Sequence, residues 1–73
     1  MKITVDWEAD ALYISFRKGK LSKNKKIDKN TIIDLDKDGN LLGIELLFMK
    51  ERIPLTSLSE ISISTAGIQK SLV

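Results

Sequence analysis

Residues 31–48, which read TIIDLDKDGNLLGIELLF, decide the fold of this protein. Two strand-like runs, residues 31–36 and 41–48, flank a polar centre that contains Asp38-Gly39. An Asp-Gly pair supplies the positive φ that tight hairpin turns require, and β-branched and aliphatic residues favour strands. The sequence therefore predicts a β-hairpin. Since residues 41–48 are apolar on much of both faces, we expect this strand at the centre of a sheet or at an oligomer contact.

The same stretch also fits the calcium-binding loop of an EF-hand, with its acidic positions at Asp34, Asp36, Asp38 and Glu45 and its glycine at Gly39. An EF-hand loop, however, lies between two helices, whereas strand-like runs flank this one. In an extended chain the residues rise by about 3.3 Å each, which would place Glu45 roughly 15–20 Å from the turn. The hairpin is the preferred interpretation, and calcium binding is the alternative.

The remaining elements follow from shorter patterns. Alternation predicts strands at residues 2–7 and 11–16 around an acidic turn, in which Asp6 can accept backbone hydrogen bonds, and a short strand at residues 25–28. Beyond Pro54, the spacing of Ser57 and Glu60 is that of a capping box and predicts a short helix. Residues 57–65 could instead form a strand, because Ile61 and Ile63 alternate with poor helix formers.

Together these elements predict one α+β domain over residues 1–73. We expect an antiparallel β-meander of four to five strands with a short C-terminal helix packed on one face. Trp7, Phe16 and Phe48 are expected in the core.

The composition excludes several classes of chemistry. Among its 73 residues the chain has no cysteine and no histidine, so it has no disulfide, no Ser-His or Cys-His catalytic pair and no Cys- or His-based zinc site. The longest uncharged stretch, residues 61–69, is too short to span a bilayer, and no apolar leader follows Met1. A cytoplasmic location without membrane contact and without a cofactor is expected.

The positive charge of the chain is concentrated in one segment, residues 17–29, which carries a net charge of +6 and leaves −4 for the rest. Its basic residues are Arg17, Lys18, Lys20, Lys23, Lys25, Lys26 and Lys29. Such a segment could bind the phosphates of nucleic acid, although it contains no aromatic side chain to stack on bases. The alternative interpretation is a solvated loop and an edge strand that lysines protect from aggregation.

The acidic residues gather in two predicted turns. The candidates are Asp6, Glu8 and Asp10 in the first turn, and Asp34, Asp36, Asp38 and Glu45 in and beside the second. The preferred interpretation is that they cap turns and keep them solvated. If both turns lay at the same end of the sheet, the carboxylates could serve a metal-assisted hydrolase, which is the enzymatic alternative.

Part of the apolar surface is predicted to remain uncovered, since one helix cannot cover a whole sheet. The candidate interface residues are Leu41, Leu47, Phe48, Ile53 and Leu55. A homo-oligomer is expected, and a small protein partner is a second use of the same surface. The favoured function is a non-catalytic interaction module, and the sequence itself indicates no specific activity.

Residues 6–14 (DWEADALYI) and 33–45 (IDLDKDGNLLGIE) resemble the YuzE-like family of small prokaryotic domains. The resemblance covers residues 1–50; Trp7 stands where such proteins usually carry proline. It implies a small antiparallel sheet with a C-terminal helix and no established catalytic activity or cofactor. Some relatives lie beside small toxin-like genes, which implies an antitoxin-like partner role.

Overall fold

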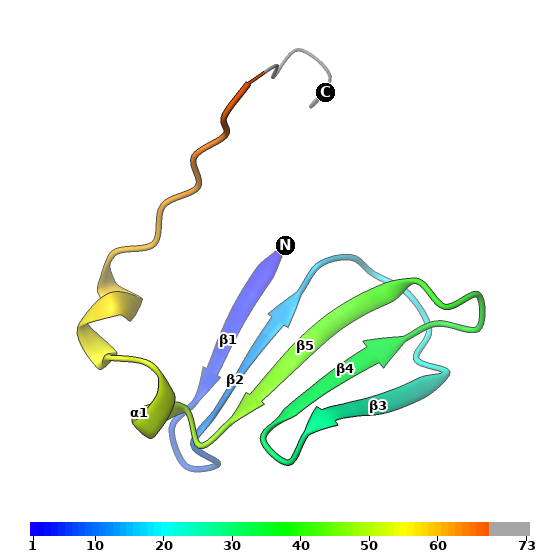
Figure 1. Cartoon of the computed structure of the whole chain (residues 1–73), viewed down its shortest axis with the longest axis horizontal. Coiled ribbons are helices and arrows are strands. Elements are labelled where there is room, and N and C mark those ends of the chain that lie inside the picture. The colour runs from blue at the N-terminus through cyan, green and yellow to red at the C-terminus, as the bar shows by residue number, and fades with distance from the viewer. Residues whose placement is uncertain (68–73) are drawn as a thin grey trace.

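The computed structural model describes residues 1–67, which form a five-stranded antiparallel sheet followed by two short helical segments (Figure 1). The elements are β1 (Lys2–Asp6), β2 (Ala11–Ser15), β3 (Lys23–Asp28), β4 (Thr31–Leu35), β5 (Leu41–Leu47), α1 (Met49–Arg52) and the 3-10 helix η1 (Leu55–Ser59). All five strands lie within two residues of their predicted bounds.

The sheet is open and its strand order is β1-β2-β5-β4-β3. The predicted simple meander is therefore wrong, because β5 lies between β2 and β4 while residues 16–22 carry the chain across to β3 at the far edge (Figure 1). Burial accounts for this order. β5 is apolar on much of both faces and takes the predicted central position, whereas every residue of the lysine-rich β3 is exposed.

The hairpin of β4 and β5 confirms the interpretation of residues 31–48. Gly39 has the expected positive φ of 83°, and its N–H donates to the Asp36 carbonyl at 3.1 Å. The turn is wider than a two-residue hairpin, because Asp36 N also bonds to the Asn40 carbonyl and the register shifts between Asp34 and Leu35. Since strands flank the loop on both sides, the helix–loop–helix arrangement of an EF-hand is absent from this segment.

The two faces of the sheet differ in polarity. Directly paired positions place Ile3, Ile14, Ile44 and Ile33 in one row across β1, β2, β5 and β4. The neighbouring positions on the opposite face form a polar row of Lys2, Ser15, Gly43, Asp34 and Asn24. We call the first face the isoleucine face and the second the polar face.

The core of the described residues is small. Only the hydrophobic side chains of Leu12, Leu42 and Met49 are buried, with exposed fractions of 3%, 5% and 0%. Leu42 is covered by the loop after β2, because a Cβ atom added to Gly19 would come within 2.6 Å of Leu42 Cδ2. Trp7 and Phe48, which were expected in the core, are about half exposed.

The C-terminal helical part is shorter than predicted. Ser57 lies inside η1 rather than at a helix start, Pro54 occupies the N-cap position, and no capping box forms. Residues 60–66 adopt neither helix nor strand, so both interpretations of residues 57–65 are wrong beyond η1. Serine, threonine and β-branched residues fill this region, and they sustain a 3-10 turn but not a longer helix.

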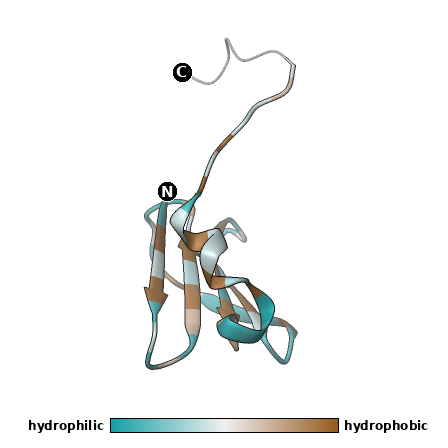
Figure 2. Ribbon diagram, turned by 90° about the vertical axis from the view of Figure 1, so that its left-hand side faces the viewer, coloured by the Kyte–Doolittle hydropathy of each residue, from teal (hydrophilic) through white to brown (hydrophobic). Residues whose placement is uncertain are grey.

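The other helical segment, α1, is a single turn that the sequence analysis did not predict. It follows Phe48, which has the left-handed φ of 54°. Both helical segments lie beside the β1 side of the sheet (Figures 1 and 2). The domain is thus mainly a β-sheet with a minor helical part.

Candidate protein interaction surface

The first acidic turn is built by its own carboxylates. Asp6 Oδ1 accepts a hydrogen bond from the Ala9 N–H at 3.0 Å, as the sequence predicts. Asp10 has a left-handed φ of 54°, and its Oδ1 accepts the N–H of Lys50 at 2.9 Å while its carbonyl accepts that of Met49 at 3.0 Å. Asp10 therefore satisfies two backbone donors at the start of α1, a role that sequence reasoning missed because α1 lies 40 residues away.

The second acidic turn is held by Asp36. Its Oδ1 accepts the N–H groups of Asp38 at 2.9 Å and Asn40 at 2.8 Å, and its Oδ2 accepts the Asn40 side-chain amide at 3.0 Å. These hydrogen bonds lower the pKa of Asp36, and the bond from the Asn40 side-chain amide has the largest effect. The nearby positive charge of Arg17 lowers the pKa further. The charged form of Asp36 thus stabilises the turn that the calcium-loop pattern had suggested as a metal site.

The two acidic turns lie at opposite ends of the sheet. The β1–β2 turn is at the end where β5 finishes, and the β4–β5 turn is at the end where β5 starts (Figure 1). Within residues 1–67, no group of three or more acidic side chains could hold a metal ion. The arrangement required by the metal-assisted hydrolase alternative is therefore not formed by these turns.

Asp34 belongs to the polar face rather than to the turn. Its Oδ2 accepts the Tyr13 hydroxyl at 2.9 Å, and its Oδ1 accepts the Asn24 side-chain amide at 2.5 Å. The Tyr13 side chain reaches across β5 above Gly43, where a Cβ atom would lie 2.2 Å from the Tyr13 hydroxyl. The carboxylate of Asp34 thus joins β2, β3 and β4. A glycine inside a strand was the available signal for this close approach.

The pKa of Tyr13 is raised above its ordinary value of 10.0. Desolvation of the hydroxyl is the largest cause, followed by the hydrogen bond to Asp34 and the negative charges of Asp34 and Glu45. At neutral pH this phenol is protonated and acts as a hydrogen-bond donor, so the group has a structural role.

The basic segment is exposed along its whole length. Its first three cations lie in the loop that precedes β3, the next three lie on β3 at the sheet edge, and Lys29 lies in the β3–β4 turn. This placement matches the interpretation as a protected edge strand. It brings no aromatic side chain among the lysines of β3.

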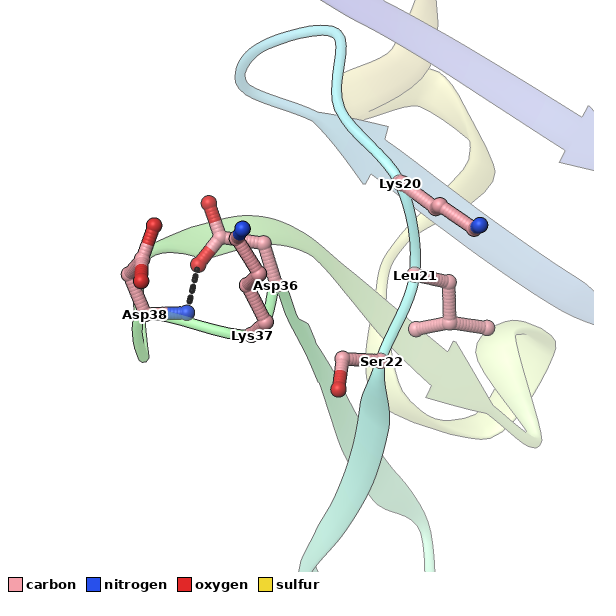
Figure 3. Close-up of a pocket in the computed structure, with 6 residues that line it drawn as sticks. All are labelled: Lys20, Leu21, Ser22, Asp36, Lys37 and Asp38. Atoms are coloured by element: carbon pink, nitrogen blue, oxygen red, sulfur yellow. Dashed lines mark hydrogen bonds between the residues drawn. The ribbon is translucent and has the colours of Figure 1, made fainter.

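A shallow cavity of about 440 Å³ lies between the loop before β3 and the β4–β5 turn. Lys20, Leu21 and Ser22 line one side, and Asp36, Lys37 and Asp38 line the other (Figure 3). The Asp36 carboxylate faces the backbone of its own turn, with its bond to the Asp38 N–H drawn in Figure 3, while the Lys20 amino group points away from both aspartates. This cavity presents charged side chains without a converging set of reactive groups.

The predicted interface residues do not form one patch. Leu41 begins β5 and Leu47 ends it, so about 20 Å separates them along an extended strand. Phe48 and Leu55 are 53% and 47% exposed beside the helical segments, and Ile53 and Leu47 are half-buried. Phe48 also lines a smaller cavity of about 270 Å³ with Lys29, Asn30 and Glu51.

The isoleucine face is a more continuous apolar surface. Leu12 and Leu42 are buried in β2 and β5, but Ile14 and Ile44 of the same strands and the same face stay partly exposed between them. Ile33 is also partly exposed, and Ile3 is 38% exposed at the edge. The alternation of each strand shows which residues share a face, but the row itself was missed because it depends on how the four strands pair.

Comparison with known protein families matches residues 2–50 to the family described as "Protein of unknown function (DUF2283)". This chain belongs to the DUF2283 family. No curated protein and no solved structure matches it significantly.

The DUF2283 match begins with β1 and ends inside α1, so it contains the whole sheet and both acidic turns. The isoleucine face and the Tyr13–Asp34 contact are therefore features of the DUF2283 region, whereas η1 and the residues after it lie outside it. Among residues 1–67, none of the helical segments has the length and apolarity required to cross a bilayer.

Proposed function

We propose that this DUF2283 domain is a non-catalytic interaction module that binds a protein partner through its isoleucine face. The single observation that carries the proposal is the row of Ile3, Ile14, Ile44 and Ile33, which remains partly exposed across four strands. A contiguous apolar surface that remains partly exposed is typical of interaction sites.

The distribution of polar groups supports this proposal. Asp6, Asp10, Asp34 and Asp36 each accept hydrogen bonds that build turns, begin α1 or join strands. These bonds give the acidic residues structural roles. The isoleucine face is left as a surface whose burial would release free energy, at about 25 cal/mol per Å² of apolar area.

The resemblance to the YuzE-like family suggests where the partner should be sought. It implies an antitoxin-like domain acting in the cytoplasm beside the product of an adjacent toxin-like gene. Binding of nucleic acid by the basic segment stays an alternative prediction, and no contact in the structure favours it over the edge-protection role.

The test compares two adjacent isoleucines on opposite faces of β4. The protein is co-expressed with the product of the neighbouring gene, and the affinity of the pair is measured by calorimetry. We expect Ile33→Thr to weaken binding by at least tenfold, because Ile33 lies on the isoleucine face. Ile32→Thr is the matched control, since Ile32 is also partly buried but points to the polar face.

Circular dichroism of both variants establishes that the sheet is retained. Equal affinity of the two variants, or failure of the neighbouring product to bind the unmodified protein, would contradict the proposal.

A further inference from the structure

The residues that follow η1 have the pattern of a strand but not its structure. We call residues 60–67 the C-terminal arm. Its first part, Glu60-Ile61-Ser62-Ile63-Ser64, alternates apolar and polar residues with β-branched isoleucines, which is typical of a half-buried strand. Ile61 and Ile63 are nevertheless 57% and 83% exposed, and the arm extends away from the sheet (Figure 1). A strand of this kind requires a sheet edge to pair with.

The two edges of the sheet differ in their ability to accept another strand. β3 carries Lys23, Lys25 and Lys26 and a register shift between Lys26 and Asp28, and both features oppose further pairing. β1 pairs with β2 in unbroken register over all five of its residues and has neither a bulge nor a proline. β1 is therefore the edge that is open to strand addition.

We propose that the C-terminal arm of one copy pairs with β1 of a second copy, and that reciprocal exchange of the two arms forms a symmetric dimer. The arm supplies five residues, 60–64, for the five residues of β1, which places Ser62 opposite Thr4. When Ile61 and Ile63 lie on the side of Ile3 and Val5, the added strand extends the isoleucine face by one strand. A reciprocal exchange closes on itself, so the assembly stops at two chains.

The direction of the arm favours a second copy over the chain's own β1. The start of α1 is held by Asp10, and Arg52 Nη1 donates to the Asn30 carbonyl at 2.6 Å, so the segment before the arm is attached to the end of the sheet. From η1 the arm leads away from the sheet, beyond the end at which β1 begins, and does not lie alongside β1 (Figures 1 and 2). Pairing with its own β1 would require the arm to turn back at η1, whereas pairing with a second copy keeps the observed direction.

The first test is the molar mass of the full chain in sedimentation between about 1 and 200 μM. We expect a dimer of twice the 8.2-kDa chain mass at the upper concentrations. Ile63→Pro should shift the dissociation constant upward by at least tenfold, because proline cannot donate to a ladder. Ile63→Val is the matched control and should dimerise like the unmodified chain. A monomer at every concentration, or an Ile63→Pro variant that dimerises normally, would overturn the proposal.

The second test identifies the paired strands. The chain has no native cysteine, so Thr4→Cys and Ser62→Cys can be introduced in separate proteins, mixed and mildly oxidised. We expect a disulfide between the two different variants. In a protein that carries both substitutions, predominant formation of a disulfide within one chain would show that the arm pairs with its own β1 and would overturn the exchange.

This dimer uses the edge of the sheet, whereas the proposed function uses its isoleucine face. Loss of dimerisation in the Ile63→Pro variant with partner binding retained would leave the proposed function intact. Equal partner affinity of the Ile33→Thr and Ile32→Thr variants would contradict the proposed function and leave the proposed dimer intact.

Discussion

At the residue scale, the contact between Tyr13 and Asp34 shows how a single glycine permits a polar link across the sheet. Gly43 occupies the centre of the polar row, and any side chain there would collide with the Tyr13 hydroxyl and with the Ile14 carbonyl, 2.2 Å and 2.8 Å from its Cβ atom. Because Gly43 leaves this space, Tyr13 on β2 reaches Asp34 on β4. Glycine in a strand usually weakens it, so the loss is offset here by a specific hydrogen bond.

Tyr13→Phe is expected to lower the free energy of unfolding by about 1 kcal/mol, the usual contribution of one hydrogen bond. The raised pKa of Tyr13 means that the folded state holds the phenolic proton more tightly than the unfolded state. The contribution of the protonated Tyr13 hydroxyl to the free energy of unfolding is fully present below pH 10. It is lost as the pH rises through the pKa of Tyr13 in the folded state.

Urea denaturation of both proteins between pH 7 and pH 11 measures this difference. The gap between the unmodified chain and Tyr13→Phe should narrow at the upper end of the range. A gap that stays constant with pH would contradict the assignment of the hydrogen bond.

At the element scale, α1 depends on a residue that comes 40 positions earlier. Asp10 accepts the Lys50 N–H, and its left-handed backbone places its carbonyl against the Met49 N–H. A four-residue helix cannot form on propensity alone, because nucleation is unfavourable. Asp10, in the β1–β2 turn, therefore supplies acceptors for the first backbone N–H groups of α1. Met49, the first residue of α1, is completely buried.

Asp10→Ala is expected to lower the free energy of unfolding by about 1–2 kcal/mol, since it removes the acceptor of the Lys50 N–H and a side chain that tolerates positive φ. Asp10→Asn keeps an acceptor oxygen and should lose less. Glu8→Ala is the matched control in the same turn, where Glu8 is exposed, and should change stability by less than about 0.5 kcal/mol. Chemical denaturation measures all three, and a Glu8→Ala effect as large as that of Asp10→Ala would argue against the capping role.

At the scale of the whole molecule, the uneven charge of the chain becomes a difference between the two edges of the sheet. The lysines of β3 protect one edge, and β1 remains open at the other. The chain thus directs strand addition to one side, because burial of a lysine ammonium in a strand interface is unfavourable.

Replacement of Lys23, Lys25 and Lys26 by threonine is expected to cause concentration-dependent aggregation, because it unblocks the β3 edge with a strand-forming residue. The matched control replaces Lys18, Lys20 and Lys29, which removes the same charge outside β3. Light scattering over a concentration series measures the effect. Equal aggregation of the two variants would show that net charge rather than edge protection keeps the protein dispersed.

Filter binding of the unmodified chain and of the same two variants to RNA at low and high salt examines the nucleic-acid alternative. Phosphate contacts by these lysines would weaken steeply with salt. If the unmodified chain retains no RNA on the filter at either salt concentration, the nucleic-acid alternative is removed.

The sequence by itself determined the strands and the central hairpin. Alternation at residues 2–6 and 11–15 and the Asp-Gly turn after β4 are local patterns, so residues close in the chain are sufficient to specify them. The membership of the isoleucine face could also be read strand by strand, because side chains alternate with period two.

Only the tertiary structure decided the strand order, the role of Asp10, the contact of Tyr13 with Asp34 and the short length of the C-terminal helical part. Each of these depends on pairs of residues that are distant in the chain, or on whether a sheet is there to support a weak local preference. Local propensities leave such choices nearly equal in free energy, so the pairing of whole strands selects among them.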